Sequence, residues 1–299
     1  MMERRFGWWP TLTALSTLDF SIQPLHEDQS EFEHVRISTR TNDGWFYPPL
    51  KTTQSTSGQA SNEVLVYAET FSLPPTHRIE ITPQSDANLA ELSNFLVILL
   101  GLLDGLQLQP EGWNHFYRTP IEIGKLVDFI STNKTKERVL TLGYRFWTDH
   151  RHSRVSKLMF GALHWHLFGA SYQHPFERFA VEYTVLDTIW NIHCELSHVA
   201  SKNRVHARRP IEICDQYDIA KPSWLSLSSK NQTVLSSLRN DFVHEGLWGG
   251  EAIGFAHPPA IQSIHFELFH FNSRILLAML GERSDYTTSL YNRQQWGLE

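Results

Sequence analysis

The chain has 299 residues, enough for about two average domains, and 41% of them are hydrophobic. Its 10 Trp, 18 Phe and 9 Tyr residues supply large apolar surfaces for a packed core, which excludes a disordered chain. The net charge of -6 argues against adhesion to nucleic acid or anionic membrane through overall charge. Any phosphate-binding surface must therefore be local.

The number of cysteines and the length of the apolar segments indicate where in the cell the protein is expected. The two cysteines, Cys194 and Cys214, cannot form a disulfide framework, and a reducing cytoplasm is the expected compartment. The longest uncharged apolar segment, residues 92–103, is shorter than the about 20 residues that a bilayer requires. We expect a buried helix there and no membrane association.

Residues 1 to about 83 show the period of two that is typical of strands. Alternating apolar and polar side chains predict strands at 33–40, 63–71 and 78–82, and Asn42-Asp43-Gly44 predicts a turn. The polar segment 51–61 is interpreted as a hairpin loop without a function of its own. The Trp-rich segments 8–9 and 45–47 are interpreted as core packing.

A helical period replaces this pattern after residue 87. A first helix is expected at 89–106, and Thr119-Pro120-Ile121-Glu122 carries the signature of a further helix start. Apolar residues at spacings of three and four predict four longer helices, at 155–163, 176–190, 234–242 and 261–279, the last ending at Gly281. A 201–229 insert with two prolines separates the second of these from the third.

These patterns predict an α+β protein with two domains, an N-terminal β-rich domain and a C-terminal all-α antiparallel helical bundle. We divide the chain into a β-rich domain (1–88), a helical connector (89–149) and the bundle (150–299). The β-rich domain is expected to sense a ligand or a protein partner and so to control the bundle.

One short motif, Leu238 to Gly246, places four polar residues beside the apolar face of the third bundle helix: Arg239, Asn240, Asp241 and His244. On a regular helix Arg239 and His244 are separated by about 140° and about 7.5 Å of rise, so they do not point at one spot. Either the helix deforms near Gly246, or a two-fold axis brings two copies of the helix around one cleft. The dimer is the more economical of the two. The alternative without function is a solvated pair that caps the helix end.

The motif Arg239-Asn240-x-x-x-His244 resembles the Arg-x4-6-His signature of the HEPN superfamily, the higher eukaryotes and prokaryotes nucleotide-binding domains. The segments 174–192 and 275–292 are similar to the Apea-like branch of that superfamily, which occurs in bacterial defence proteins. The resemblance covers roughly residues 150–292. The N-terminal half is similar to that branch only in being β-rich and followed by helices.

The resemblance implies a homodimeric, metal-independent endoribonuclease without a cofactor, an effector of bacterial anti-phage defence or a toxin. His244 would act as general base or acid on the 2′-hydroxyl or the leaving 5′-oxygen, and Arg239 would hold the phosphate in a bidentate contact. Asn240 would orient the phosphate or the imidazole, and Asp241 would neutralise Arg239 when RNA is absent. The expected products carry a 2′,3′-cyclic phosphate and a 5′-hydroxyl. The alternative is a non-catalytic HEPN module that binds a nucleotide or a protein.

Two local concentrations of basic residues are candidate RNA tracks. In 144–157 the cations alternate with Tyr144, Phe146 and Trp147, and aromatic side chains stack on bases in single-strand sites. The insert starting at Ser201 is the second candidate. The expected RNA-binding residues are Arg145, Arg151, Arg154, Lys157, Lys202, Arg204, Arg208 and Arg209. His164-x-His166 suggests zinc, but two histidines two apart on a helix splay by about 200°, so no metal site is expected.

Overall fold

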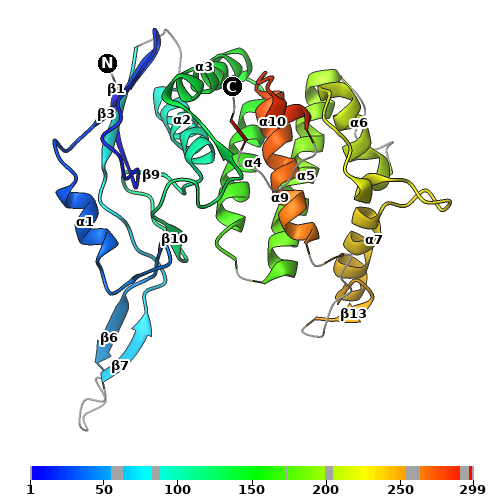
Figure 1. Ribbon diagram of the computed structural model, residues 1–299, viewed down its shortest axis with the longest axis horizontal. Helices are drawn as coiled ribbons and strands as arrows, with labels where there is room; N and C mark the ends of the chain where they lie inside the picture. The colour runs from blue at the N-terminus through cyan, green and yellow to red at the C-terminus, as the bar shows by residue number, and fades with distance from the viewer. Residues whose placement is uncertain are drawn as a thin grey trace. The chain divides into compact units, whose positions relative to one another are not determined.

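A computed structural model of the chain describes residues 2–54, 63–82, 88–172, 174–198, 205–253, 261, 263–289 and 296–297. The chain divides into two compact units, residues 1–126 and 127–299. The first contains most of the strands, and the second is mainly helical (Figure 1). This mixed α and β content agrees with the sequence-based expectation.

A five-stranded sheet forms the main layer of the first unit, with the order β2-β3-β8-β1-β9 and antiparallel neighbours. The apolar helix α2 (Leu89–Asp104) contacts β1, β8 and β9. Trp8 and Trp9 follow β1 and are buried, as the sequence predicts. The strands are β1 (Met2–Gly7), β2 (Leu15–Ser16), β3 (Phe20–Pro24), β8 (His77–Ile81) and β9 (Gln109–Pro110).

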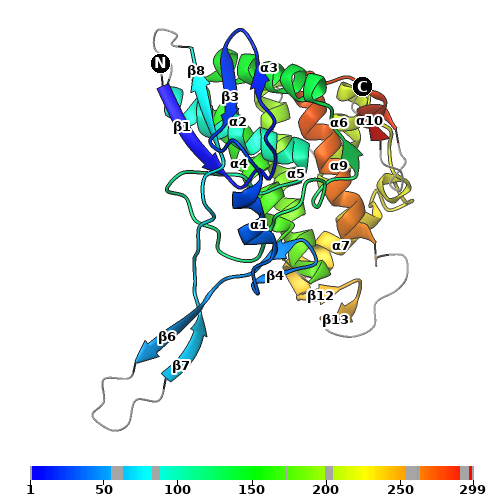
Figure 2. The same ribbon diagram turned by 60° about the vertical axis from the view of Figure 1, so that its left-hand side comes forward.

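Two hairpins add further strands to this unit. Strands β4 (Thr41–Asn42) and β5 (Trp45–Phe46) pair across Asp43 and Gly44, whose φ angles of 47° and 71° are those of the expected two-residue turn. Strands β6 (Leu50–Gln54) and β7 (Glu63–Tyr67) form the second hairpin, which extends away from the sheet of its unit (Figure 2). The predicted loop 51–61 is therefore strand up to Gln54, and 55–61 lie outside the described residues.

Two local predictions in this unit are wrong. Residues 33–40 do not form a strand, because helix α1 (Ser30–Arg36) buries Phe32 and packs Val35 against the core beside Trp8. Residues 119–120 do not start a helix. They form β10 (Thr119–Pro120), which pairs with β5, and the following Ile121 is buried in the same core. In both cases tertiary packing selects between two local patterns that short segments fit equally well.

The second unit is a bundle in which α4, α5 and α9 contact one another (Figure 1). The predicted helix ranges lie within or overlap the observed ones, and the insert contains one further helix, α6. The elements are β11 (Phe129–Ile130), α3 (Asn133–His150), α4 (Arg154–Gly169), α5 (Pro175–Ser197), η2 (His206–Arg208), α6 (Arg209–Tyr217), η3 (Ser223–Leu225), α7 (Val234–Asn240), η4 (Asp241–Glu245), β12 (Leu247–Trp248), β13 (Glu251–Ala252), α9 (Ile264–Met279), α10 (Asp285–Thr288) and β14 (Trp296–Gly297).

A buried polar network fixes the contacts between these three helices. His166 of α4 lies 2.9 Å from the Glu182 carboxylate of α5, measured from Nδ1, and 2.8 Å from Ser273 Oγ of α9, measured from Nε2. Asn272 of α9 donates to the same carboxylate. All four side chains are buried, so each polar group depends on its protein partners rather than on water. His166, the residue that suggested zinc, thus has a carboxylate and a hydroxyl as neighbours.

The predicted boundaries at 88/89 and 149/150 differ from the observed division after Leu126. The segment 89–149 is not a separate connector, because α2 packs on the sheet of the first unit and α3 belongs to the second. Among the described helices none is both long and apolar enough to cross a membrane.

Candidate functional site

A π-helical turn brings Arg239 and His244 together within one chain. Helix α7 ends at Asn240, and the next five residues form η4, in which hydrogen bonds run from i to i+5. Residues five apart therefore lie above one another, and Arg239 Nη1 is 2.8 Å from His244 Nε2. The first of the two sequence-based alternatives, deformation of the helix, explains how this pair meets, and no second copy is needed for it.

The residues around the turn explain why it forms there. Gly246 ends the turn with a φ of 68°, in the left-handed region that glycine adopts at little cost. Phe242, in the middle of the turn, packs edge-on against Phe179 of α5 and Trp248 of β12. This packing keeps an apolar side chain on the bundle side while the chain widens. His244 and Val243 remain exposed.

The contacts of Arg239 connect the polar side chains of the motif. A guanidinium can only donate, so His244 Nε2 is the acceptor in this contact. Arg239 also donates to Asn240 Oδ1 at 3.1 Å. Asn240 thus orients the guanidinium, whereas it was expected to orient phosphate or imidazole. Asp241, which was expected to neutralise Arg239, lines a neighbouring pocket instead.

A second polar group lies on the adjacent elements α5, η2 and α6. His206 Nδ1 is 3.3 Å from Tyr183 Oη and 3.7 Å from an oxygen of Asp187. Arg209 donates to the same Asp187 oxygen at 3.1 Å. Tyr183 is buried, while His206 and Asp187 are each more than one-third exposed. The group therefore has a buried side, formed by Tyr183, and a side that solvent reaches.

Helix α7 contacts η2, and the charge of Arg239 acts on the second group as well. Burial and the Asp187 carboxylate raise the pKa of Tyr183 to about 12, against the opposing charges of Arg239 and Arg209. Burial and the charge of Arg209 lower the pKa of His206, Arg239 lowers it further, and Asp187 opposes them. Arg239 therefore acts on His206 and Tyr183 while it contacts His244. We call these residues the Arg239 cluster: Tyr183, Asp187, His206, Arg209, Arg239, Asn240 and His244.

Packing of α5 against the segment α7–η4 accounts for the proximity of the two polar groups. Phe179, Tyr183 and Asp187 follow one another at intervals of four residues and so share one face of α5. Phe242 contacts Phe179, and Arg239 lies three residues before Phe242 on the other helix. Arg208 of η2 donates to Asn231, in the loop before α7, at 3.5 Å. Side-chain contacts thus join α5 to η4 and η2 to the loop before α7.

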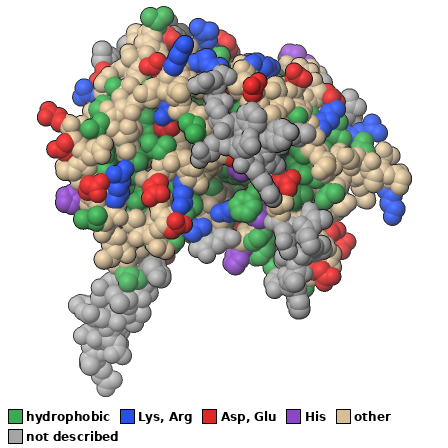
Figure 3. Space-filling model, viewed as in Figure 1, with side chains coloured by type: hydrophobic (Ala, Val, Ile, Leu, Met, Phe, Trp, Pro, Cys, Tyr) green, Lys and Arg blue, Asp and Glu red, His purple; other side chains and the backbone are tan. Residues whose placement is uncertain are grey.

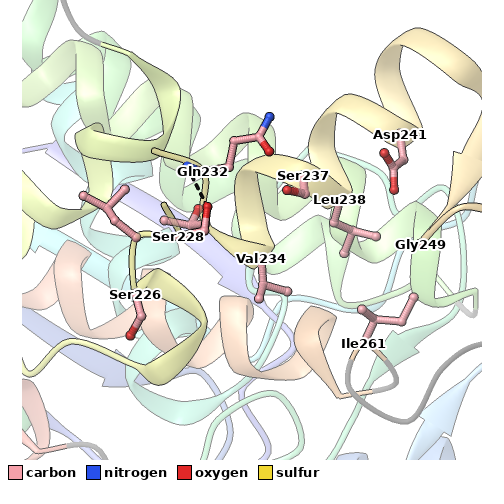
Figure 4. Close-up of a pocket in the computed structure, with 11 residues that line it drawn as sticks. Ser226, Ser228, Gln232, Val234, Ser237, Leu238, Asp241, Gly249 and Ile261 are labelled. Atoms are coloured by element: carbon pink, nitrogen blue, oxygen red, sulfur yellow. Dashed lines mark hydrogen bonds between the residues drawn. The ribbon is translucent and has the colours of Figure 1, made fainter. Parts of the chain in front are cut away.

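A pocket of about 500 Å³ lies on another side of α7. Leu238 of α7 and Asp241 of η4 project toward it, and Ser237 also lies on α7 (Figure 4). Hydroxyl and amide groups of the preceding loop complete its polar lining, with Ile261 and Gly249 opposite. A pocket of this size can hold a nucleoside, for which hydroxyls and one carboxylate offer hydrogen bonds.

The predicted RNA-binding residues that the structure describes lie on several elements, from α3 to α6. Arg145, Arg154 and Lys157 are exposed, and Arg154 is 3.9 Å from Glu195. Arg151 donates to His152, and Arg209 belongs to the Arg239 cluster. Lys202 and Arg204 lie outside the described residues. On the face drawn in Figure 3, basic and acidic side chains are interspersed.

The aromatic part of the predicted single-strand track is wrong. Tyr144, Phe146 and Trp147 are buried in the second unit, with exposed fractions of 4%, 8% and 6%. Buried rings cannot stack on bases, so this segment has exposed cations without a stacking platform. Helical periodicity explains the error, because side chains that alternate in sequence lie on different sides of α3.

Sequence reasoning missed Tyr183, Asp187 and His206. A signal was present for His206, since it lies in the basic segment 202–209, which was assigned to RNA binding only through its Lys and Arg residues. Tyr183 and Asp187 both lie in the predicted helix 176–190, and nothing in that segment marks them as site residues. Only the packing of α5 brings them to η2. Among the described residues no group of three or more side chains is arranged to hold a metal ion.

Comparison of the chain with protein-family models, with curated protein sequences and with solved structures gave no significant match. A functional conclusion therefore depends on the geometry of the Arg239 cluster and on the motif that it contains.

Proposed function

We propose that the protein is a metal-independent endoribonuclease of the HEPN type, with the Arg239 cluster as its active site. The observation that carries the proposal is the 2.8 Å contact between Arg239 and His244, made by a π-helical turn in a partly exposed position. π-Helical turns are rare and frequently occur at functional sites. The resemblance of the motif to the Arg-x4-6-His signature is the second support.

The chemistry of RNA cleavage fits this pair of side chains. The ribose 2′-hydroxyl is a nucleophile within the substrate, so the site has to move protons and stabilise the charge that develops on phosphorus-bound oxygens. A guanidinium presents paired N–H donors that match two phosphate oxygens, and a neutral imidazole has a lone pair for a proton. DNA lacks the nucleophile and is expected to stay intact.

The proposal includes a homodimer and a role in bacterial anti-phage defence or as a toxin, both of which rest on the resemblance alone. In such a dimer the partner would not be needed to unite Arg239 with His244, because one chain already does so. It would place two complete clusters in one assembly. The N-terminal unit is proposed to sense a regulatory ligand or protein.

The test is cleavage of single-stranded RNA by the full-length protein in excess EDTA. Arg239→Ala and His244→Ala are each expected to lower the rate by about 10²–10⁴-fold, because each removes a group that acts only in the transition state. Arg36→Ala and His34→Ala on α1 are matched controls that leave the rate unchanged. Cleavage at the wild-type rate by both site variants contradicts the proposal, and so does a requirement for a divalent metal.

A second candidate is a non-catalytic module that binds a nucleotide. It is favoured by one observation: Arg239 donates to His244 Nε2, so the lone pair that a base needs is occupied in the free protein. RNA that stays intact under all conditions, together with saturable binding of a nucleotide that Arg239→Ala abolishes, would support this candidate.

A further inference from the structure

His206 has the surroundings of a general base. An imidazole serves as a base when one ring nitrogen is held by a hydrogen-bond acceptor and the other carries a free lone pair, as in sites where a carboxylate orients a histidine. The Nδ1 atom of His206 faces the Asp187 carboxylate and Tyr183 Oη, at 3.7 and 3.3 Å. Tyr183 Oη is the hydrogen-bond partner of Nδ1, and the Asp187 carboxylate, at 3.7 Å, attracts a proton to the same nitrogen, which leaves the lone pair on Nε2.

Burial and the neighbouring charges favour the neutral ring. Burial lowers the pKa of His206, and the charges of Arg209 and Arg239 lower it further, against the attraction of Asp187. A base must be unprotonated at the pH of the reaction, so this environment suits a proton acceptor better than a proton donor. More than one-third of the His206 side chain is exposed, so a substrate can reach it.

We propose that His206 is the general base of the reaction and that His244 is the general acid, so that one subunit contains a complete pair of proton-transfer groups. This inference rests on the proposed ribonuclease function and deepens it. Arg239 contacts His244, and η2, which carries His206, packs against α7, which carries Arg239. The proposed phosphate position on Arg239 therefore adjoins the segments of both imidazoles. Asp187 is a positioning residue, because its carboxylate, 3.7 Å from Nδ1, favours the tautomer with the proton on that nitrogen.

The proposed step balances as follows. His206 Nε2 takes the proton of the ribose 2′-hydroxyl, and the 2′-oxygen forms a bond to phosphorus. The bond between phosphorus and O5′ breaks, its electron pair stays on O5′, and His244 donates a proton there. His244 can carry that proton because a phosphate draws the Arg239 N–H away from Nε2, which then takes up a proton from solvent. The products are a 2′,3′-cyclic phosphate and a 5′-hydroxyl.

The decisive experiment compares two single-stranded substrates that differ in the leaving atom, a ribonucleotide linkage with O5′ and the same linkage with sulfur at that position. A thiolate leaves without protonation, so it removes the need for a general acid but not for a base. We expect His206→Ala and His244→Ala each to slow cleavage of the oxygen substrate by about 10²–10⁴-fold. The sulfur substrate restores His244→Ala to within about tenfold of the wild type and leaves His206→Ala slow.

The pH dependence provides a second readout that a structural role would not change. A base is active when neutral, so the wild-type rate falls on the acid side as His206 is protonated, and this acid limb is absent in His206→Ala. The groups that act on the ring are Tyr183, through a hydrogen bond, and the charges of Asp187 of α5, Arg209 of α6 and Arg239 of α7. Asp187→Asn is expected to lower the rate less than His206→Ala does.

Folding is checked with thermal unfolding of His206→Gln, which retains an amide near Tyr183, and with His34→Ala as a control. His206→Ala or His206→Gln at the wild-type rate overturns the inference, as does rescue of His206→Ala by the sulfur substrate. If Arg239→Ala is inactive in that case, the proposed function stands without this role for His206. If Arg239→Ala and His244→Ala also cleave at the wild-type rate, the proposed function fails.

Discussion

Buried histidines in the first unit predict a loss of stability in mild acid. His115 is 3% exposed, its ring stacks on Phe71 at 5.3 Å, and its Nδ1 has no hydrogen-bond partner among the described residues. Burial lowers the pKa of His115 to about 4, and burial likewise lowers the pKa of His77 to about 4. In the unfolded chain a histidine titrates near pH 6.5.

The sign of the effect follows from which state binds the proton first. As the pH falls below about 6.5, the two histidines bind protons in the unfolded chain but not in the folded chain, so the unfolded state is favoured. The contribution of each ring is complete above the unfolded pKa and is lost as the pH falls toward 4. Each unit of pKa difference corresponds to about 1.4 kcal/mol, so each ring contributes about 3 kcal/mol in all and loses about 2 kcal/mol between pH 7 and pH 5.

The substitution His115→Phe isolates one of the two contributions. Phenylalanine keeps an aromatic ring against Phe71 and removes the titrating group, so the stability lost between pH 7 and 5 through these rings should fall from about 4 to about 2 kcal/mol. Urea-dependent hydrogen exchange of peptides from β1 and β8 measures the stability of this unit alone. His34→Phe, at an exposed position on α1, is the matched control and should keep the wild-type difference. A loss in His115→Phe equal to that of the wild type would refute the reasoning.

Three further predictions concern the second unit. Glu182→Gln is expected to lower the free energy of unfolding by about 3 kcal/mol in urea titrations, because it removes the carboxylate beside buried His166; a loss below about 1 kcal/mol would mean that the network adds little. Gly246→Ala should cost about 1 kcal/mol and Gly246→Asn less, measured by thermal unfolding, since no atom of the described residues lies within 4 Å of an added Cβ and the positive φ sets the cost; equal costs would point to another cause. Burial raises the pKa of Cys214 to about 12 and also raises that of Cys194, so iodoacetamide at pH 8 should label neither thiol until the chain unfolds; rapid labelling of folded protein would contradict this.

Sequence patterns alone determined the features that depend on long periodic segments. The change from strand to helix periodicity, the helix 89–104 and the apolar face of α9 each follow from many residues that fit the same period. The Asn42-Asp43-Gly44 turn was also predictable, because few residues tolerate positive φ at two successive positions. The motif from Arg239 to His244 could be identified, but its geometry could not.

Tertiary structure decided everything that depends on which faces meet. The segment 33–40 fits a strand pattern, yet Phe32 and Val35 find apolar partners only as a helix. The regular helix predicted for 234–242 is widened by η4, which aligns Arg239 with His244, whereas the sequence spacing left a helix deformation and a dimer both open. Tyr183, Asp187 and His206 belong to the site because α5 and η2 pack beside α7, a contact between segments that short-range periodicity does not encode.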